Sequence, residues 1–212
     1  MKILIVGATG LVGSEILKLT LQRPEVSEVF TFVRRSSRIV HPKLKENIVD
    51  FKNVSSWKDK LHGDVLFSAL GTTIKTAGSK LAQFEVDYDF QFNIAAAAKG
   101  NGVPTLVLIS STGANPHSPL FYLRTKGLLE EAVKNLSFKK VIVLRPSLLA
   151  GKREVPRLGE KISFMVLSRL PRFKSLSTLI PVEASRVAHK AVDLALNNFS
   201  LSCTLEAKDI IF

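Results

Sequence analysis

The sequence predicts an α/β fold built on a doubly wound parallel sheet with a small C-terminal substrate lobe. Three observations predict this fold: a short apolar run at Lys2–Val6, a glycine cluster directly after it, and an alternation of strand-like and helix-like segments that continues to Arg145. A continuous apolar run is typical of a strand buried on both faces, as in parallel sheets that are covered by helices.

Six segments before Arg145 have the composition and length of strands. In order they are Lys2–Val6, Glu28–Val33, Asn47–Phe51, Asp64–Ala69, Thr105–Ser110 and Lys140–Leu144. Helical spacing of apolar residues predicts helices between most of them, at Ser14–Gln22, Ser56–Leu61, Lys80–Lys99 and Leu120–Lys134. Gly100 and Gly102 end the third of these helices. This order implies parallel strands with right-handed crossovers and helices on both faces of the sheet.

The pattern changes after Arg145-Pro146. Arg157–Leu170 has the spacing of a basic, partly apolar helix, Ala184–Ala195 that of a last amphipathic helix, and Cys203–Leu205 that of a final strand. Because no linker or repeat separates these segments from the rest, we expect one domain over residues 1–212. Residues 147–182 are the expected substrate or lid region.

Length and composition exclude several classes of protein. The chain has 212 residues, of which 46% are hydrophobic and 23% are charged, as in a globular domain with a buried core. Cys203 is the single cysteine, so no internal disulfide forms. The first apolar run is too short for a secretory signal, and no stretch of 18 apolar residues is present. We therefore expect a cytoplasmic protein that neither is secreted nor spans a membrane.

The net charge of +12 indicates an anionic ligand or partner. Ten basic and two acidic residues lie between Lys139 and Lys174, so this stretch holds +8 of the total. A basic face that only confers solubility explains the same count. A nucleic-acid or anionic-membrane binder is a third interpretation, but no aromatic stacking platform accompanies the basic residues, and we expect no nucleic-acid partner.

The glycine cluster predicts a dinucleotide site. Gly7, Gly10 and Gly13 are spaced by three residues and lie between a buried strand and a helix. The first glycine allows a tight turn, the second lets a pyrophosphate approach the backbone, and the helix N-terminus supplies free amide groups. At the end of the first strand of an alternating chain, this pattern indicates a Rossmann-like nucleotide-binding fold.

Two arginines predict which dinucleotide binds. NAD-preferring sites carry an acidic residue at the end of the second strand, whereas this chain has Arg34-Arg35 there. Guanidinium groups suit a 2′-phosphate, so NADP(H) is favoured over NAD(H). A solvated arginine pair is the alternative interpretation. Asp50-Phe51, after the third predicted strand, are in a position to meet the adenine, although a strand-end Asp is often a turn residue.

A Ser, Tyr and Lys set predicts carbonyl reduction. Tyr122 and Lys126 are four residues apart and so share a helix face, and Ser110 closes the fifth predicted strand at the edge where open parallel sheets bind ligands. Tyr122 is the expected proton donor, and the Lys126 cation is expected to favour its phenolate. Ser110 is expected to polarise the substrate oxygen, with Ser111 or Thr112 as alternatives.

Together these motifs resemble the atypical branch of the short-chain dehydrogenase/reductase superfamily. Leu70-Gly71-Thr72-Thr73, Tyr122–Gly127, Leu144-Arg145-Pro146 and Arg157–Glu160 are similar to the Tat-interacting-protein oxidoreductase subgroup over nearly the whole chain. The resemblance implies an NADPH-binding Rossmann fold with Tyr122 as proton donor or acceptor. It also implies cofactor contacts from Thr9, Leu11, Val12, Arg34, Arg35, Leu70, Gly71, Tyr122, Lys126, Leu149 and Arg157.

The remaining polar residues give no further site. The four histidines lack metal-ligand spacing, so no metal is predicted, and Asp87 and Asp89 are expected to lie in solvent. The predicted function is that of an NADPH-dependent carbonyl reductase acting on a small molecule. The alternative is a non-catalytic NADP(H)-binding regulatory protein. The substrate and the oligomeric state do not follow from the sequence.

Overall fold

The central feature of the computed structural model, which describes residues 1–150, 181–197 and 201–211, is a seven-stranded parallel sheet. Its strand order is β3-β2-β1-β4-β5-β6-β9. These strands are β1 (Lys2–Val6), β2 (Glu28–Val33), β3 (Leu44–Ile48), β4 (Val65–Ser68), β5 (Thr105–Ile109), β6 (Lys140–Arg145) and β9 (Cys203–Glu206). The order reverses between β1 and β4, which is the point where doubly wound sheets bind nucleotides. The predicted fold class is confirmed.

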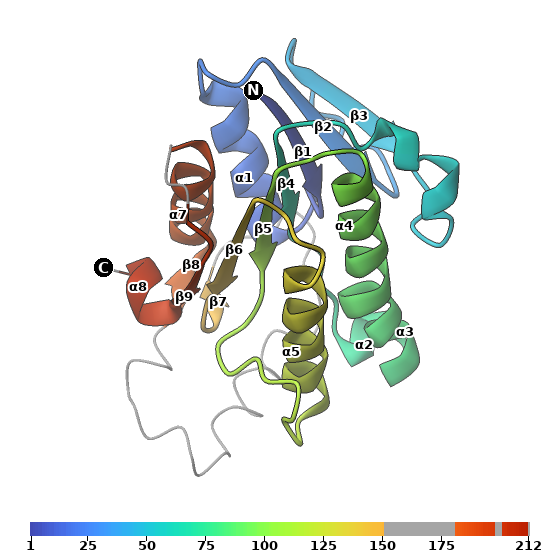
Figure 1. Cartoon of the computed structure of the whole chain (residues 1–212), viewed down its shortest axis with the longest axis vertical. Coiled ribbons are helices and arrows are strands. Elements are labelled where there is room, and N and C mark those ends of the chain that lie inside the picture. The colour runs from blue at the N-terminus through green and yellow to red at the C-terminus, as the bar shows by residue number, and fades with distance from the viewer. Residues whose placement is uncertain (151–180, 198–200, 212) are drawn as a thin grey trace.

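Helices cover both faces of the sheet (Figure 1). On one side lie α1 (Leu11–Gln22) and α7 (Ala184–Leu196), which pack against each other. On the other side lie α4 (Phe90–Gly100) and α5 (Phe121–Lys134). Shorter helices are α2 (Ile74–Ala77), α3 (Lys80–Phe84) and α8 (Ala207–Ile211). A π-helical turn, η3 (Glu85–Asp89), joins α3 to α4.

Side-chain alternation along β1 explains why its sequence is apolar throughout. Ile3 and Ile5 enter the core beneath α1 and α7, whereas Leu4 and Val6 enter the core beneath α4 and α5. All four are fully buried, because successive residues of a strand point to opposite faces. The two cores therefore share one sheet, and the sheet fixes the positions of the loops at its carboxyl edge.

The structure corrects two of the predicted elements and adds a small second sheet. β3 comprises Leu44–Ile48, three residues before the predicted Asn47–Phe51, because β3 is an edge strand without a buried residue, and its apolar signal is weak. The predicted helix Ser56–Leu61 is two 3₁₀ turns, Val54–Ser56 and Lys58–Lys60. A two-stranded sheet of β7 (Leu149–Ala150) and β8 (Val182–Glu183) was not predicted.

Two predicted features fall on residues that the structure does not describe. The helix Arg157–Leu170 and most of the expected lid, residues 147–182, lie outside the described residues. Among the helices that are described, none has the length and apolar composition needed to cross a membrane.

Candidate functional site

The glycine loop lies at the point where the strand order reverses. Gly7 follows β1 with φ of +82°, and a Cβ there would lie 2.5 Å from the Ala69 carbonyl oxygen at the end of β4. A Cβ on Gly13 would lie 2.1 Å from the Gly7 carbonyl oxygen. Glycine is thus required at both positions by close backbone approach. The loop stays narrow and holds the start of α1 beside the end of β4.

The first turn of α1 presents backbone groups to this crevice. Gly10 is the N-cap and no side chain caps the helix, so the first amides of α1 are available to an anion. Leu11 and Val12 are 9% and 4% exposed and pack in the core, so their contribution to a ligand is limited mainly to their amides. Thr9 is exposed. These residues fit the pyrophosphate of a dinucleotide.

The predicted arginine pair lies at the end of β2. Arg34 and Arg35 are exposed, and Glu46 of β3 shapes the loop that follows them. The Ser37 amide donates to both Glu46 oxygens, at 3.1 and 3.0 Å. Partial burial raises the pKa of Glu46, but hydrogen bonds from Ser36 and Ser37 outweigh it, and the net pKa is lowered. Sequence reasoning missed Glu46, which looks like an ordinary strand residue.

Asp50 and Phe51 differ in what they offer to an adenine. Asp50 is exposed, and its carboxylate accepts a hydrogen bond from the Lys52 amide. Phe51 is 5% exposed and packs between Trp57 and Phe90, at ring distances of 5.9 and 5.8 Å. The Phe51 ring is committed to the core, so its predicted contact with adenine has little support here.

The predicted Ser, Tyr and Lys residues meet at the carboxyl edge of β5 and the start of α5. Lys126 Nζ lies 5.9 Å from the centre of the Tyr122 ring. Ser111 is near enough to the Tyr122 side chain to lower its pKa, and the Ser111 hydroxyl donates to the Thr112 carbonyl oxygen at 3.4 Å. Ser110 instead is 5% exposed and donates its hydroxyl proton to Glu130 of α5. Of the serines that the sequence left open, Ser111 is therefore the one beside the phenol.

The net pKa of Tyr122 is raised above its ordinary value of 10.0. Desolvation is the main cause and raises it, Lys126 lowers it, and Asp87 raises it. Tyr122 still keeps 39% of its surface exposed, so the ring borders the open edge of the sheet. The expected bias toward phenolate is thus opposed, and the phenol is protonated at neutral pH.

Asp87 is the acidic partner of Lys126, and the prediction that it lies in solvent is wrong. Its carboxylate is 3.3 Å from Lys126 Nζ, and the two side chains are 0% and 3% exposed. The π-helical turn η3 directs Asp87 inward, whereas Asp89 is partly exposed. Sequence reasoning judged the two aspartates from their separation alone. A signal was present in the polar residues Gln83, Asp87 and Gln91, which are spaced by four.

A second buried carboxylate, Glu130, joins α5 to the end of the sheet. Arg145 of β6 donates to both Glu130 oxygens, at 3.0 and 2.6 Å, and to Glu206 of β9 at 2.8 Å. Glu130 is 2% exposed. Hydrogen bonds to Glu130 raise the pKa of Arg145, so its guanidinium stays charged. Neither residue was predicted as part of the site.

The other predicted contacts are spread around the same edge. Leu70 and Gly71 follow β4 directly, beside the glycine loop. Leu149 lies in β7 and is 37% exposed. Arg157 lies outside the described residues. Among the residues that the structure describes, no cluster of three His, Cys, Asp or Glu side chains is arranged to hold a metal ion.

Comparison with protein families gives a match that agrees with this geometry. The model of an NAD(P)H-binding family matches residues 7–164. The chain belongs to this NAD(P)H-binding family. The match covers the glycine loop, the arginine pair and the Tyr122–Lys126 segment.

Curated relatives of this NAD(P)H-binding protein include fungal proteins named FMP52, mitochondrial. The Candida albicans protein is 36% identical over 92% of this chain and 88% of its own length. The Saccharomyces cerevisiae protein is 35% identical over 92% of this chain and 87% of its own length. These names contradict the expected cytoplasmic location. The composition on which that expectation rested does not separate the cytosol from other reducing compartments.

Solved structures that contain NAD share the fold. MoeE5 in complex with UDP-glucuronic acid and NAD has a TM-score of 0.73, with 17% identity over 98% of this chain and 76% of its own. WbmH of Bordetella bronchiseptica in complex with NAD⁺ has a TM-score of 0.71, with 18% identity over 96% of this chain and 75% of its own. Both structures contain bound small molecules.

Proposed function

We propose that this NAD(P)H-binding protein is an NADPH-dependent oxidoreductase that reduces the carbonyl group of a small molecule. We assign it to the atypical short-chain dehydrogenases and, within them, to the Tat-interacting-protein subgroup. The observation that carries the proposal is that Tyr122 and Lys126 of α5 lie with Ser111 at the carboxyl edge of β5, the strand that adjoins β4. The names of the fungal relatives support a mitochondrial location.

The chemistry assigned to the chain is proton delivery. NADPH, when bound, supplies the hydride that adds to the carbonyl carbon, and the C=O π electrons move to the oxygen. Tyr122 gives its phenolic proton to that oxygen, so an alcohol and oxidised cofactor result, and solvent returns the proton to the phenolate. Ser111 donates a hydrogen bond to the same oxygen and polarises the carbonyl before transfer.

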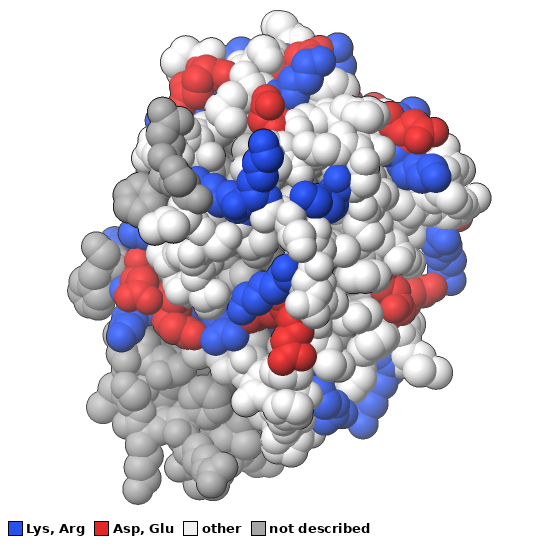
Figure 2. Space-filling view, in the orientation of Figure 1, with Lys and Arg blue, Asp and Glu red and all other residues white. Residues whose placement is uncertain are grey.

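We propose that the basic stretch serves a small anionic ligand and not a nucleic acid. Of its ten basic residues, Lys139, Lys140 and Arg145 are described. Lys140 is 8% exposed and donates to the Leu194 carbonyl oxygen at 2.6 Å, while Arg145 is held by Glu130 and Glu206. Figure 2 shows basic and acidic side chains interspersed over the visible face. Two of the three described cations are thus committed to the fold.

The test is the variant Tyr122→Phe, assayed with NADPH against a panel of aldehydes and ketones. We expect NADPH affinity to stay within a few-fold of wild type, because the ring is retained. Turnover should fall by about 10²–10⁴-fold, as for loss of a general acid. Undiminished turnover would assign the proton donor elsewhere. NADPH binding by the wild type without turnover on any carbonyl would favour the regulatory alternative.

A further inference from the structure

The buried Asp87–Lys126 pair is the part of the site that the proposed chemistry does not yet use. Lys126 comes from α5 and Asp87 from η3, and their charged groups meet at 3.3 Å with almost no exposed surface. A buried ammonium without a partner is strongly unfavourable. Asp87 also raises the pKa of Lys126, which burial alone would lower. The lysine is therefore held as a cation whose nearest charge is a carboxylate.

Asp87 is itself fixed by groups from several elements. Its carboxylate accepts from the Thr72 amide at 3.3 Å and from Gln83 Nε2 at 3.1 Å. Its backbone carbonyl accepts from Gln91 Nε2 at 2.9 Å, and Gln91 in turn accepts from the Ser68 hydroxyl at 2.8 Å. Each of these contacts joins η3 to β4, to the loop after β4 or to the flanking helices. The carboxylate consequently has little freedom to turn away from Lys126.

Tyr122 lies against this pair and responds to both charges. Lys126 and Asp87 act on the phenol with opposite sign. Glu130 also faces Lys126, but the Arg145 guanidinium pairs with it through two hydrogen bonds. The charged groups described around the phenol and its lysine are therefore Lys126, Asp87 and Glu130, with Arg145 behind. A lysine in contact with a carboxylate stabilises a nearby phenolate much less than a lysine alone.

We infer that Asp87 is a positioning residue whose carboxylate holds the Lys126 ammonium and reduces the stabilisation that this cation gives to the Tyr122 phenolate. The inference rests on the proposed function, in which Tyr122 is the proton donor. Its consequence is that the Tyr122 phenol is a weaker acid, and its phenolate a stronger base, than beside a lysine that has no carboxylate partner.

The inference is testable without cofactor or substrate, because the chain has two tyrosines. Tyr88→Phe leaves Tyr122 as the single phenol and preserves the stacking of ring 88 on Phe84 and Phe92. In this background the ultraviolet absorbance of phenolate reports the titration of Tyr122. Asp87→Asn should lower the titration midpoint by about one pKa unit, a tenfold change in the ionisation constant. Asp89→Asn, on the same turn, is the matched control and should leave the midpoint unchanged.

An unchanged or raised midpoint in folded Asp87→Asn would overturn the inference. If that variant does not fold, the doubly neutral variant Asp87→Asn with Lys126→Met decides the question. Loss of two cancelling charges should leave the midpoint within about half a pKa unit of the parent. A rise of more than about one unit would show that Lys126 acts alone and would overturn the inference as well. Failure of the carbonyl-reductase proposal would leave these titrations unaffected, so the two outcomes are distinguishable.

Discussion

At the residue scale, the candidate site depends on glycines where an added Cβ would force the backbone to move. Gly7 and Gly102 both have positive φ, at +82° and +86°. A Cβ on Gly7 would meet the Ala69 carbonyl, whereas a Cβ on Gly102 would have nothing within 4 Å. Comparison of alanine substitutions at Gly7 and Gly102 therefore separates two costs to stability: that of a left-handed alanine, and that of a Cβ too close to another backbone segment.

Gly7→Ala is therefore expected to be much more damaging than Gly102→Ala. Gly102→Ala should lower the free energy of unfolding by about 1–2 kcal/mol, the cost of a left-handed alanine. Gly7→Ala should cost more and should also abolish NADPH binding, because the crevice between β1 and β4 must widen. Urea denaturation and cofactor titration check both variants. Equal losses of stability would show that close approach at Gly7 is unimportant.

Arg34 and Arg35 set a second expectation at this scale, for cofactor choice. The wild type should bind NADPH more tightly than NADH, since the guanidinium groups suit a 2′-phosphate. Arg34→Ala with Arg35→Ala should remove the preference while leaving NADH affinity nearly unchanged. Fluorescence titration with both cofactors measures this, and equal affinity of the wild type for the two would contradict it.

Glu46 gives the pH dependence of the loop that carries those arginines. Its pKa lies below the ordinary value of 4.5, so its contribution to stability is present above pH 4.5 and is lost as the pH falls through the lower, folded value. Glu46→Gln should accordingly be less stable than wild type at neutral pH, and the difference should shrink in acid. Thermal unfolding across this range checks it. A constant difference would mean that the Glu46 charge has no part in holding Ser37.

At the scale of elements, the sequence was informative where residues are buried and less so where they pair across the fold. β1 and the helix around Tyr122 were predicted closely, because apolar spacing reports burial directly. The predicted position of β3 was displaced, because an edge strand without a buried residue gives a weak apolar signal. The π-helical turn was missed, because one extra residue in a helical turn leaves the apolar spacing almost unaltered. Asp87, Glu130 and Arg145 were missed for a related reason: their partners lie far along the chain.

Arg145 of β6 connects α5 and β9 through its hydrogen bonds, and its loss should destabilise the fold. Arg145→Met leaves Glu130 buried without its guanidinium, which is expected to cost about 3–5 kcal/mol of unfolding free energy. Adding Glu130→Gln to this variant should recover part of the loss. Glu206→Gln, at a side chain 41% exposed, is the control and should cost less than about 1 kcal/mol. Chemical denaturation of these proteins and of Glu130→Gln alone checks this, and additive losses would argue against a coupled pair.

At the scale of the whole molecule, the two cores share every central strand, so they should be lost together. Trp57 reports on the core beneath α4 and α5, and α7 belongs to the core on the opposite face. Trp57 fluorescence and far-ultraviolet circular dichroism should therefore give one coincident unfolding transition. NADPH at 100 times its Kd should raise the free energy of unfolding measured by either probe by about 2.7 kcal/mol. Separate midpoints would show that the faces unfold independently.

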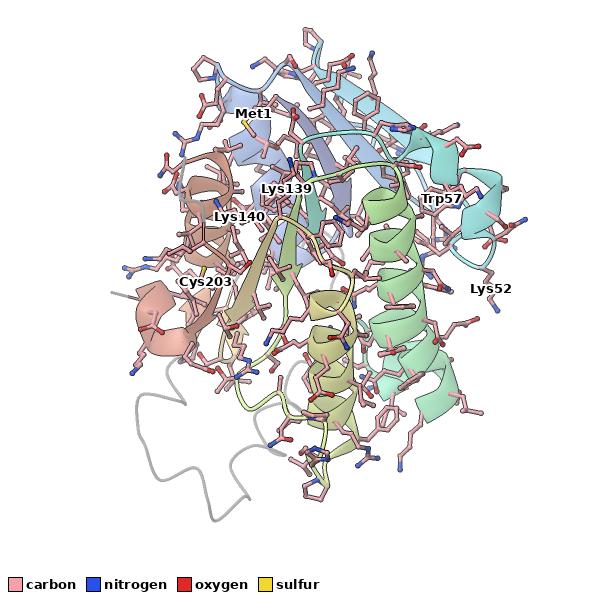
Figure 3. All side chains as sticks on the ribbon, viewed as in Figure 1. Met1, Lys52, Trp57, Lys139, Lys140 and Cys203 are labelled. Atoms are coloured by element: carbon pink, nitrogen blue, oxygen red, sulfur yellow. The ribbon has the colours of Figure 1, made fainter. Side chains whose placement is uncertain are left out.

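Parallel strands also divide the molecule into a reacting end and an inert end. Met1 precedes β1, and the exposed Lys139 precedes β6, so both lie at the edge opposite the glycine loop (Figure 3). Attachment of the protein to a bead or electrode through Lys139 would leave the crevice beside the glycine loop facing the solution. The strand direction that gathers the chemistry at one edge thus also provides a handle for oriented immobilisation at the other.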